Sequence, residues 1–299
     1  MIELVIVSGK GGVGKTTISS SLAFLAGRKG YSVVAVDADV DAPNLSLLLG
    51  GELVKEKRLS VSEKARIVQD LCEKCGKCYE ACVFGSIEKL DGGYVVASIH
   101  CEGCGVCEAV CPAGAVKIEP VENGRISIFR SRFGFPLVVG QMDVGESGSG
   151  KIVSEVKEEA RRVASQVKAS LLIVDGPPGA GCSAISAISG ASHVLLVTEP
   201  TKAAKHDLER VLSIVNHFGV PFGAVVNRFD AYPEMASEIS RLIEDEGGEV
   251  LALIPSDEEV VHSIVNGQPV VERSPSSPAS KAIEEAFRRV EELLKGGIL

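Results

Sequence analysis

Residues 8–17 have the spacing of a phosphate-binding loop. The segment reads Ser-Gly-Lys-Gly-Gly-Val-Gly-Lys-Thr-Thr, and the required positions are filled by Gly9, Gly14, Lys15 and Thr16. Glycines let backbone N–H groups wrap around phosphate oxygens, and the helix that follows directs the positive end of its dipole at them. We expect Lys15 to lie along the β- and γ-phosphates and the Thr16 hydroxyl to bind Mg²⁺. The segment therefore predicts an ATP site.

The whole loop is expected to contact the nucleotide. Its candidate binding residues are Gly9, Lys10, Gly11, Gly12, Val13, Gly14, Lys15, Thr16 and Thr17. A second match to the glycine spacing occurs at Gly145, Gly150 and Lys151, but Ile152 stands where a hydroxyl is needed. We interpret that second match as a connection from a strand to a helix, with Lys151 early in the helix.

Eight of the nine cysteines lie between residues 72 and 111, and Cys182 stands apart. They form two runs with the same spacing: Cys72, Cys75, Cys78 and Cys82, then Cys101, Cys104, Cys107 and Cys111. Residues 71–88 repeat as 100–117, which indicates an internal duplication. Clustered thiols in a reducing compartment bind metal more often than they form disulfides.

The spacing within each run is similar to that of bacterial two-cluster ferredoxins, in which the fourth cysteine of a run binds the other cluster. This resemblance implies two [4Fe–4S] clusters. The first would be held by Cys72, Cys75, Cys78 and Cys111, and the second by Cys82, Cys101, Cys104 and Cys107. Val83 departs from the pattern, because a proline usually follows this cysteine. Four-cysteine zinc sites are the alternative, although they rarely carry a third and fourth cysteine at this spacing.

Apolar runs alternate with helical patterns over most of the chain. Strands are expected at Ile2–Val7, Ser32–Val36, Leu137–Val139, Leu171–Val174, Val194–Val197, Phe222–Val226 and Val250–Ile254. Helices are expected near residues 16–29, 151–168, 202–217, 234–246 and 279–295. Nearly continuous Val, Ile and Leu runs are typical of a parallel sheet covered on both faces. The pattern predicts a doubly wound, mostly parallel α/β sheet.

The alternation stops at the cysteine-rich segment and then resumes. Nucleotide-binding signals lie on both sides of this break, so an insertion is simpler than two tandem domains. We expect a discontinuous P-loop ATPase domain over residues 1–56 and 127–299. Residues 57–126 would form a small inserted α+β domain of the ferredoxin kind.

Composition excludes several classes of function. The net charge is −9 and tryptophan is absent, which disfavours a nucleic-acid partner. No run of 18 apolar residues is present, so no membrane span is expected. The chain begins with a strand pattern rather than a secretory leader, and a cytoplasmic location is expected.

Lys10, which follows the opening glycine, makes the loop more specific than a general P-loop. This feature resembles the deviant loop of the ParA/MinD/Mrp family, which includes the nitrogenase iron protein. The resemblance implies that Lys10 reaches the nucleotide of a second copy, so that ATP binding and homodimer formation are coupled. A cation supplied in this way stabilises charge on the transferred phosphoryl group. Catalytic roles would fall to Lys10, Lys15 and Asp39.

Other segments match the same family. The resemblance assigns Asp39 to positioning the attacking water and Asp37 to the Mg²⁺ shell. Asp175 closes a hydrophobic strand, as in a Walker B motif, and would hold Mg²⁺ through water. Residues 176–179 resemble a second switch loop. The adenine would be contacted by Asn227 and Pro255.

Two features leave alternatives open. Cys182, in the second switch region, is favoured as a small buried residue at a helix start, although a redox-sensing or bridging thiol is also considered. The apolar stripe of the last helix invites comparison with a membrane-targeting helix, but we expect it to pack on the sheet. The stripe comprises Ala282, Ile283, Ala286, Phe287, Val290, Leu293 and Leu294.

The two sets of motifs lead to three functional hypotheses. The first is an ATPase in which dimer closure gates electron transfer through two clusters to an unidentified redox partner. The second is an Mrp-like ATPase that assembles iron–sulfur clusters or carries them to an acceptor protein. The third is a positioning ATPase of the MinD or ParA kind. All three include binding of ATP and its hydrolysis to ADP and phosphate.

Overall fold

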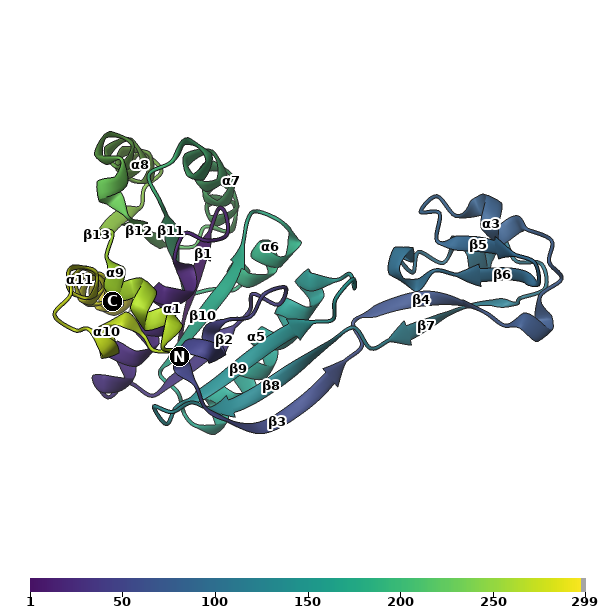
Figure 1. Cartoon of the computed structure of the whole chain (residues 1–299), viewed down its shortest axis with the longest axis horizontal. Coiled ribbons are helices and arrows are strands. Elements are labelled where there is room, and N and C mark those ends of the chain that lie inside the picture. The colour runs from purple at the N-terminus through teal and green to yellow at the C-terminus, as the bar shows by residue number, and fades with distance from the viewer. Residues whose placement is uncertain (297–299) are drawn as a thin grey trace. The chain divides into compact units, whose positions relative to one another are not determined.

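A nine-stranded sheet carries the larger part of the chain in this computed structural model, which describes residues 1–296 (Figure 1). Its strands are β1 (Ile2–Ser8), β2 (Val33–Asp37), β3 (Glu52–Leu59), β8 (Gly124–Arg130), β9 (Pro136–Met142), β10 (Leu171–Pro178), β11 (His193–Thr198), β12 (Phe222–Asn227) and β13 (Glu249–Ile254). They lie in the order β13-β12-β11-β1-β10-β2-β9-β8-β3. The pairs from β13 to β9 are parallel. The mostly parallel α/β fold predicted from the sequence is confirmed.

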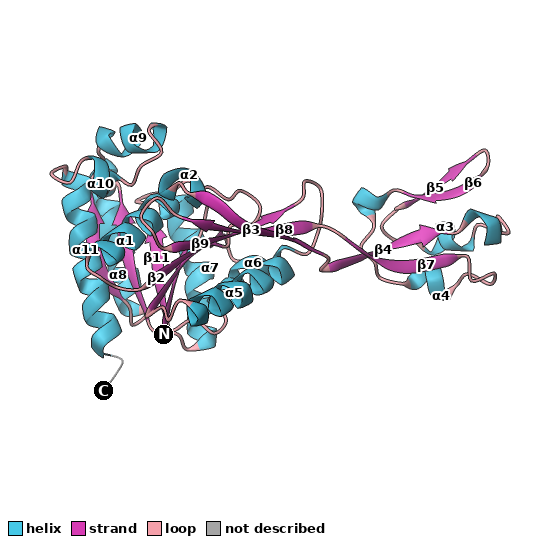
Figure 2. Cartoon of the chain, turned by 90° about the horizontal axis from the view of Figure 1, so that it is seen from below, coloured by secondary structure: helices cyan, strands magenta, loops and turns pink. Residues whose placement is uncertain are grey.

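Helices cover both faces of this sheet. They are α1 (Lys15–Arg28), α2 (Leu45–Leu49), α5 (Ser149–Gln166), α6 (Cys182–Ile188), α7 (Lys202–Phe218), α8 (Pro233–Asp245), α9 (Glu258–Val265), α10 (Val270–Arg273) and α11 (Pro278–Gly296). Figure 2 shows α1 and α11 on one side of the strands and α5 and α6 on the other. Helices on both faces explain why the central strands are apolar at successive positions.

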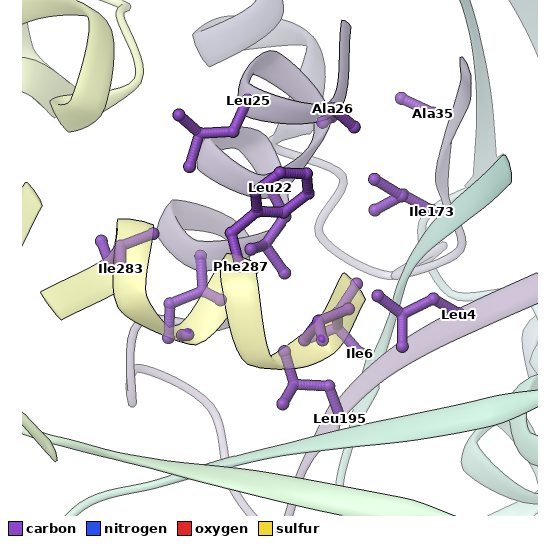
Figure 3. Packing of buried hydrophobic residues seen from close by; sticks show 14 of the residues in the cluster. Leu4, Ile6, Leu22, Leu25, Ala26, Ala35, Ile173, Leu195, Ile283 and Phe287 are labelled. Carbon is purple, nitrogen blue, oxygen red and sulfur yellow. The ribbon is translucent and has the colours of Figure 1, made fainter. Parts of the chain in front are cut away.

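Alternate side chains of each central strand enter opposite layers of the core. Leu4 and Ile6 of β1 pack with α1 and α11, where Leu22 and Phe287 lie (Figure 3). Val5 and Val7 are equally buried and face the opposite layer. The strand β1 is therefore fixed from both sides, and it delivers the loop that follows Ser8 to the carboxyl edge of the sheet.

The last helix packs on the sheet, as expected. Ile283, Phe287 and Val290 of α11 are almost fully buried and belong to the same core cluster as Leu22 and Leu25 of α1. The side chain of Leu294, which was part of the expected stripe, lies outside the described residues. Because the described part of the stripe is covered by the protein's own core, it is not a free membrane-binding face.

The cysteine-rich segment forms a second compact unit, Lys57–Arg125 together with Met142–Gly148. Its strands and helices are β4 (Ser62–Ile67), α3 (Lys77–Ala81), β5 (Ile87–Leu90), β6 (Gly93–Val96), α4 (Val106–Ala109) and β7 (Val116–Val121). β4 pairs antiparallel with β7, and β5 pairs antiparallel with β6. The boundaries 57–126 stay a prediction, and the sequence offered no signal that residues 142–148 join this unit.

The two halves of this unit repeat the same local structure. A 3-10 turn precedes the first cysteine of each run, at Gln69–Leu71 and at Ser98–His100. A glycine in the left-handed region then opens each short helix, Gly76 before α3 and Gly105 before α4. The duplication seen in the sequence is therefore also a duplication of backbone conformation.

Candidate functional site

The phosphate-binding loop joins the end of β1 to the start of α1. Gly14 caps α1 with a φ of 97°, which lies in the left-handed region that favours glycine. Gly9 lies so close to α7 that a Cβ atom would come within 2.5 Å of the Asp207 carbonyl carbon. Both positions therefore need glycine, one for its backbone angle and one for space.

Three side chains from the loop and from α1 converge on Asp175 at the carboxyl end of β10. The Lys15 ammonium lies 2.9 Å from Asp175 Oδ1, and Ser19 Oγ donates to the same oxygen at 2.8 Å. Thr16 Oγ1 donates to Asp175 Oδ2 at 2.7 Å. The structure therefore brings Lys15, Thr16 and Asp175 together. Ser19, one helical turn after Lys15, was missed because a serine inside a helix carries no signal of its own.

Asp37 ends β2 and Asp39 follows it, and the two carboxylates differ in whether they contact Lys15. Asp39 Oδ2 lies 3.5 Å from Lys15 Nζ, whereas both oxygens of Asp37 accept backbone hydrogen bonds, from Asp39 and Leu45. Burial, reinforced by the charge of Asp175, holds the pKa of Asp37 well above its usual range. Burial lowers the pKa of Lys15, but Asp175 and Asp39 outweigh it, and the net pKa is raised. Lys15 is thus charged among three carboxyl groups.

Lys10 lies at the outer rim of the loop, in contact with the connection between β11 and α7. Its ammonium is 2.6 Å from Glu199 Oε1 and 3.5 Å from Thr201 Oγ1. Glu199 Oε2 is 3.5 Å from Nη2 of Arg228, and the same nitrogen donates to the Gly12 carbonyl at 2.6 Å. Sequence reasoning missed Glu199 and Arg228, since no family motif marked either position.

The two residues expected to contact adenine lie at neighbouring strand ends. Asn227 Nδ2 donates to the Val13 carbonyl at 2.8 Å, so this side chain supports the phosphate-binding loop. Pro255 follows β13, and the next residue, Ser256, donates its backbone N–H to Asp230 at 2.7 Å. Because β12 and β13 are adjacent parallel strands, both residues lie at the carboxyl edge where ligands of such sheets bind.

The second switch segment starts inside β10, which includes Gly176, Pro177 and Pro178. Gly179 donates its N–H to the Ser8 carbonyl at 2.8 Å, which ties this segment to the phosphate-binding loop. Cys182 begins α6 as expected, but its side chain is exposed, so the expectation of a buried residue was wrong. Lys151 lies in the first turn of α5, which confirms that the second glycine match is a helix start.

The eight clustered cysteines line two separate cavities of the second unit. One cavity is bordered by Cys82, Cys101, Cys104 and Cys107. The other is bordered by Cys72, Cys75, Cys78 and Cys111. Each cavity thus takes three cysteines from one run and the fourth from the other run.

Backbone and hydroxyl groups point at several of these sulfur atoms. Ser86 N donates to Cys82 Sγ at 3.4 Å, and Ala115 N donates to Cys111 Sγ at 3.3 Å. Burial opposes the thiolate of Cys82, but hydrogen bonds, foremost from Ser86, outweigh it and lower the pKa. Within residues 1–296, no three histidine, cysteine or carboxylate side chains are arranged to hold a metal ion. The two-cluster assignment and the zinc alternative both stay predictions at these cysteines.

The fold and the phosphate-binding loop define a P-loop nucleotide-binding protein. The chain belongs to the family described as the CobQ/CobB/MinD/ParA nucleotide binding domain, which matches residues 4–270. An uncharacterized protein of Methanocaldococcus jannaschii is 39% identical over 230 residues, covering 76% of this chain and 78% of the relative. A chloroplastic homologue of the septum site-determining protein MinD from Arabidopsis thaliana is 28% identical. The match covers 97% of this chain and 74% of the relative. The P-loop ATPase family expected from the sequence is confirmed.

Solved structures share the fold. The cell division ATPase MinD of Pyrococcus furiosus superposes with a TM-score of 0.58 at 23% identity, covering 98% of this chain and 99% of that one. MinD of Aquifex aeolicus gives a TM-score of 0.60 at 20% identity, covering 98% and 97%. At these identities the similarity concerns the fold alone.

The comparisons correct the leading functional expectation. The relatives with a functional name are MinD-type proteins, and their names describe no iron–sulfur or electron-transfer function. The prediction that dimer closure gates electron transfer to a redox partner was therefore wrong, and the expected iron–sulfur acceptor has no support. Among the three hypotheses, the MinD and ParA hypothesis fits the relatives. Over residues 1–296, no helix is long and apolar enough to cross a bilayer.

Proposed function

We propose that this chain is a MinD/ParA-type ATPase that binds ATP with Mg²⁺ and hydrolyses it to ADP and phosphate. The observation that carries the proposal is the convergence of Lys15, Thr16 and Ser19 on the Asp175 carboxylate. These groups belong to the end of β10 and to α1, whose first turn follows the phosphate-binding loop. Hydrolysis of a nucleoside triphosphate needs a lysine that contacts the phosphates, and a hydroxyl and a carboxylate that hold Mg²⁺.

The donor set fits Mg²⁺. Asp37 and Asp175 are both fully buried, and Lys15 is the buried cation that faces them. Hydroxyl and carboxylate oxygens are ligands that Mg²⁺ accepts, usually together with water and phosphate oxygens. We propose that Thr16 binds Mg²⁺ directly and that Asp37 and Asp175 belong to its outer shell. When bound, the ion would neutralise charge that develops on the β- and γ-phosphates.

The remaining residues have roles around this centre. Asp39, 3.5 Å from Lys15, would orient the attacking water. The Lys10 side chain would leave its contacts within its own chain and reach the nucleotide of a second copy. ATP-dependent dimer formation would then be part of the hydrolysis cycle. Asn227 and Pro255 would contact the adenine. One solved structure that shares the fold is a complex of MinC and MinD from Aquifex aeolicus, and we propose that this chain also engages a protein partner.

The test is the molecular mass in solution with different nucleotides. Sedimentation velocity of the wild-type chain should give a dimer with Mg-ATP and a monomer with Mg-ADP. Lys10→Ala should stay monomeric with either nucleotide while it still binds ATP. The same mass with both nucleotides would overturn the switching cycle, and failure to bind ATP at all would overturn the proposal as a whole.

We also propose that the second unit holds two [4Fe–4S] clusters. The support is the lining of the two cavities, each with four cysteines drawn from both runs. Backbone N–H groups directed at Cys82, Cys101 and Cys111 would stabilise thiolate sulfur. The ligand sets would be Cys72, Cys75, Cys78 and Cys111 for one cluster and Cys82, Cys101, Cys104 and Cys107 for the other. In this account the clusters stabilise the inserted unit, because four ligands tie the two halves of the repeat together.

A further inference from the structure

Lys10 has a partner on its own chain, and that partner is held in place from a second direction. The carboxylate of Glu199 contacts Lys10 through Oε1 at 2.6 Å and Arg228 through Oε2 at 3.5 Å. The Glu199 side chain is 14% exposed and that of Lys10 is 32% exposed. This pair is thus partly shielded from water, which strengthens it relative to a surface ion pair.

The surroundings leave Lys10 little freedom to turn while this contact lasts. The neighbouring Gly9 lies against the backbone of α7 at Asp207, and Arg228 donates to the Gly12 carbonyl across the loop. Thr201, which caps α7 by accepting from Ala204 N, also lies 3.5 Å from the Lys10 ammonium. The loop from β11 to α7 therefore holds the lysine through two side chains.

From this geometry we propose that Glu199 is a positioning residue that holds Lys10 in cis and must release it before Lys10 can serve a second copy. The inference rests on the proposed ATP-dependent dimer. One lysine cannot pair with Glu199 and with a phosphate of another chain at the same time. The Lys10–Glu199 ion pair must consequently break before the dimer forms, which lowers the dimerisation constant. Arg228 keeps the Glu199 carboxylate at the rim of the phosphate-binding loop when Lys10 leaves.

The effect of breaking the Lys10–Glu199 pair on the dimerisation constant follows from the strength of such ion pairs. A partly exposed ion pair shifts a population by roughly two- to fivefold. A symmetric dimer needs two released lysines, so loss of both contacts should multiply the dimerisation constant by the square of that factor, roughly four to twenty-five.

The experiment measures the ATP-dependent dimerisation constant by sedimentation velocity over a series of protein concentrations. Glu199→Gln keeps the size of the side chain and removes its charge, and it should dimerise at roughly four- to twenty-five-fold lower concentration. Glu199→Asp, which keeps the charge, should lie closer to the wild type. The ATP affinity of the Lys10→Ala monomer should be the same with and without Glu199→Gln, because the contact acts through Lys10.

A matched control is the pair Lys205–Glu238, with a 3.0 Å separation and a lysine that is 33% exposed. Glu238→Gln should leave the dimerisation constant unchanged. If the wild type dimerises with ATP and Glu199→Gln has the same constant or a weaker one, the holding role of Glu199 is wrong while the proposed function stands. If no ATP-dependent dimer forms in any variant, the proposed function itself fails, and the role of Glu199 fails with it.

Discussion

Lys15 and Asp175 are joined by a 2.9 Å contact between the ammonium and Oδ1, which links the phosphate-binding loop to the end of β10. Both side chains are buried, and the parallel register of β1 and β10 sets the distance between their ends. The site therefore depends on two segments 160 positions apart in the chain, brought together by strand pairing.

Lys15→Ala should weaken ATP binding by roughly 30-fold or more, since loss of one partner of a buried charged contact costs about 2–5 kcal/mol. Equilibrium binding of a fluorescent ATP analogue measures this. The chain supplies its own control in Lys151, which ends the second glycine match and is exposed in the first turn of α5. Lys151→Ala should bind ATP normally. Equal loss in both variants would remove the phosphate-binding role from residues 8–17.

Asp39→Ala should bind ATP but hydrolyse it roughly 100-fold more slowly, which is the loss expected when a group that positions or activates water is removed. Phosphate release under saturating ATP gives the rate. The neighbouring carboxylate Asp41 is exposed, and Asp41→Ala should keep normal turnover. Wild-type turnover in Asp39→Ala would show that another group handles the attacking water.

Asp257→Ala should destabilise the larger unit by about 1–2 kcal/mol at neutral pH, the usual loss for a helix cap. Its carboxylate accepts from Glu259 N at the start of α9 and from Ala279 N at the start of α11. Burial raises the pKa of Asp257, but these hydrogen bonds outweigh it and the net pKa is lowered. The stabilisation by Asp257 is therefore fully present above its unfolded-state pKa near 3.8. It is lost as the pH falls through the lower pKa of the folded state. Urea unfolding from pH 7 to about pH 3 should show the variant and wild type converging, and a constant difference would refute the cap.

Metal content tests the cysteine assignments. Anaerobic wild-type protein should contain about eight irons per chain, the number that two four-iron clusters require. Cys72→Ser with Cys111→Ser should lose about four irons, because both residues line one cavity. Cys72→Ser with Cys82→Ser should lose nearly all, because these residues line different cavities. Cys182→Ser is the control and should keep all the iron. Zinc in place of iron, or equal losses in the two double variants, would contradict the ligand sets.

Much of the larger unit could be predicted because its signals are local. The run Ile2–Val7 followed by glycines indicates a strand and a phosphate-binding loop without any knowledge of the rest of the chain. The strands β3 and β8 were missed. For β3 the reason is that it lies at the exposed edge of the sheet and lacks an apolar run, since it carries Glu52, Lys55, Glu56 and Lys57. Edge strands are commonly charged, so the apolar pattern that marks central strands does not mark them.

Parts of the site depend on tertiary packing and were not predictable. Glu199 reaches Lys10 because β11 lies beside β1, an order of strands that the sequence pattern does not specify. The exposure of Cys182 likewise depends on how α6 leaves the end of β10. The grouping of the cysteines in two cavities could be expected, because it follows from a repeated spacing and its resemblance to a known arrangement.

The central claim, a nucleotide-switched dimer that depends on Lys10, is tested most directly by turnover at different protein concentrations. If Lys10 acts on the nucleotide of a second copy, ATP hydrolysis per chain should rise with protein concentration until the dimer is saturated. In Lys10→Ala it should be low at every concentration. Hydrolysis per chain that is the same at all concentrations, in the wild type and in Lys10→Ala alike, would contradict the account.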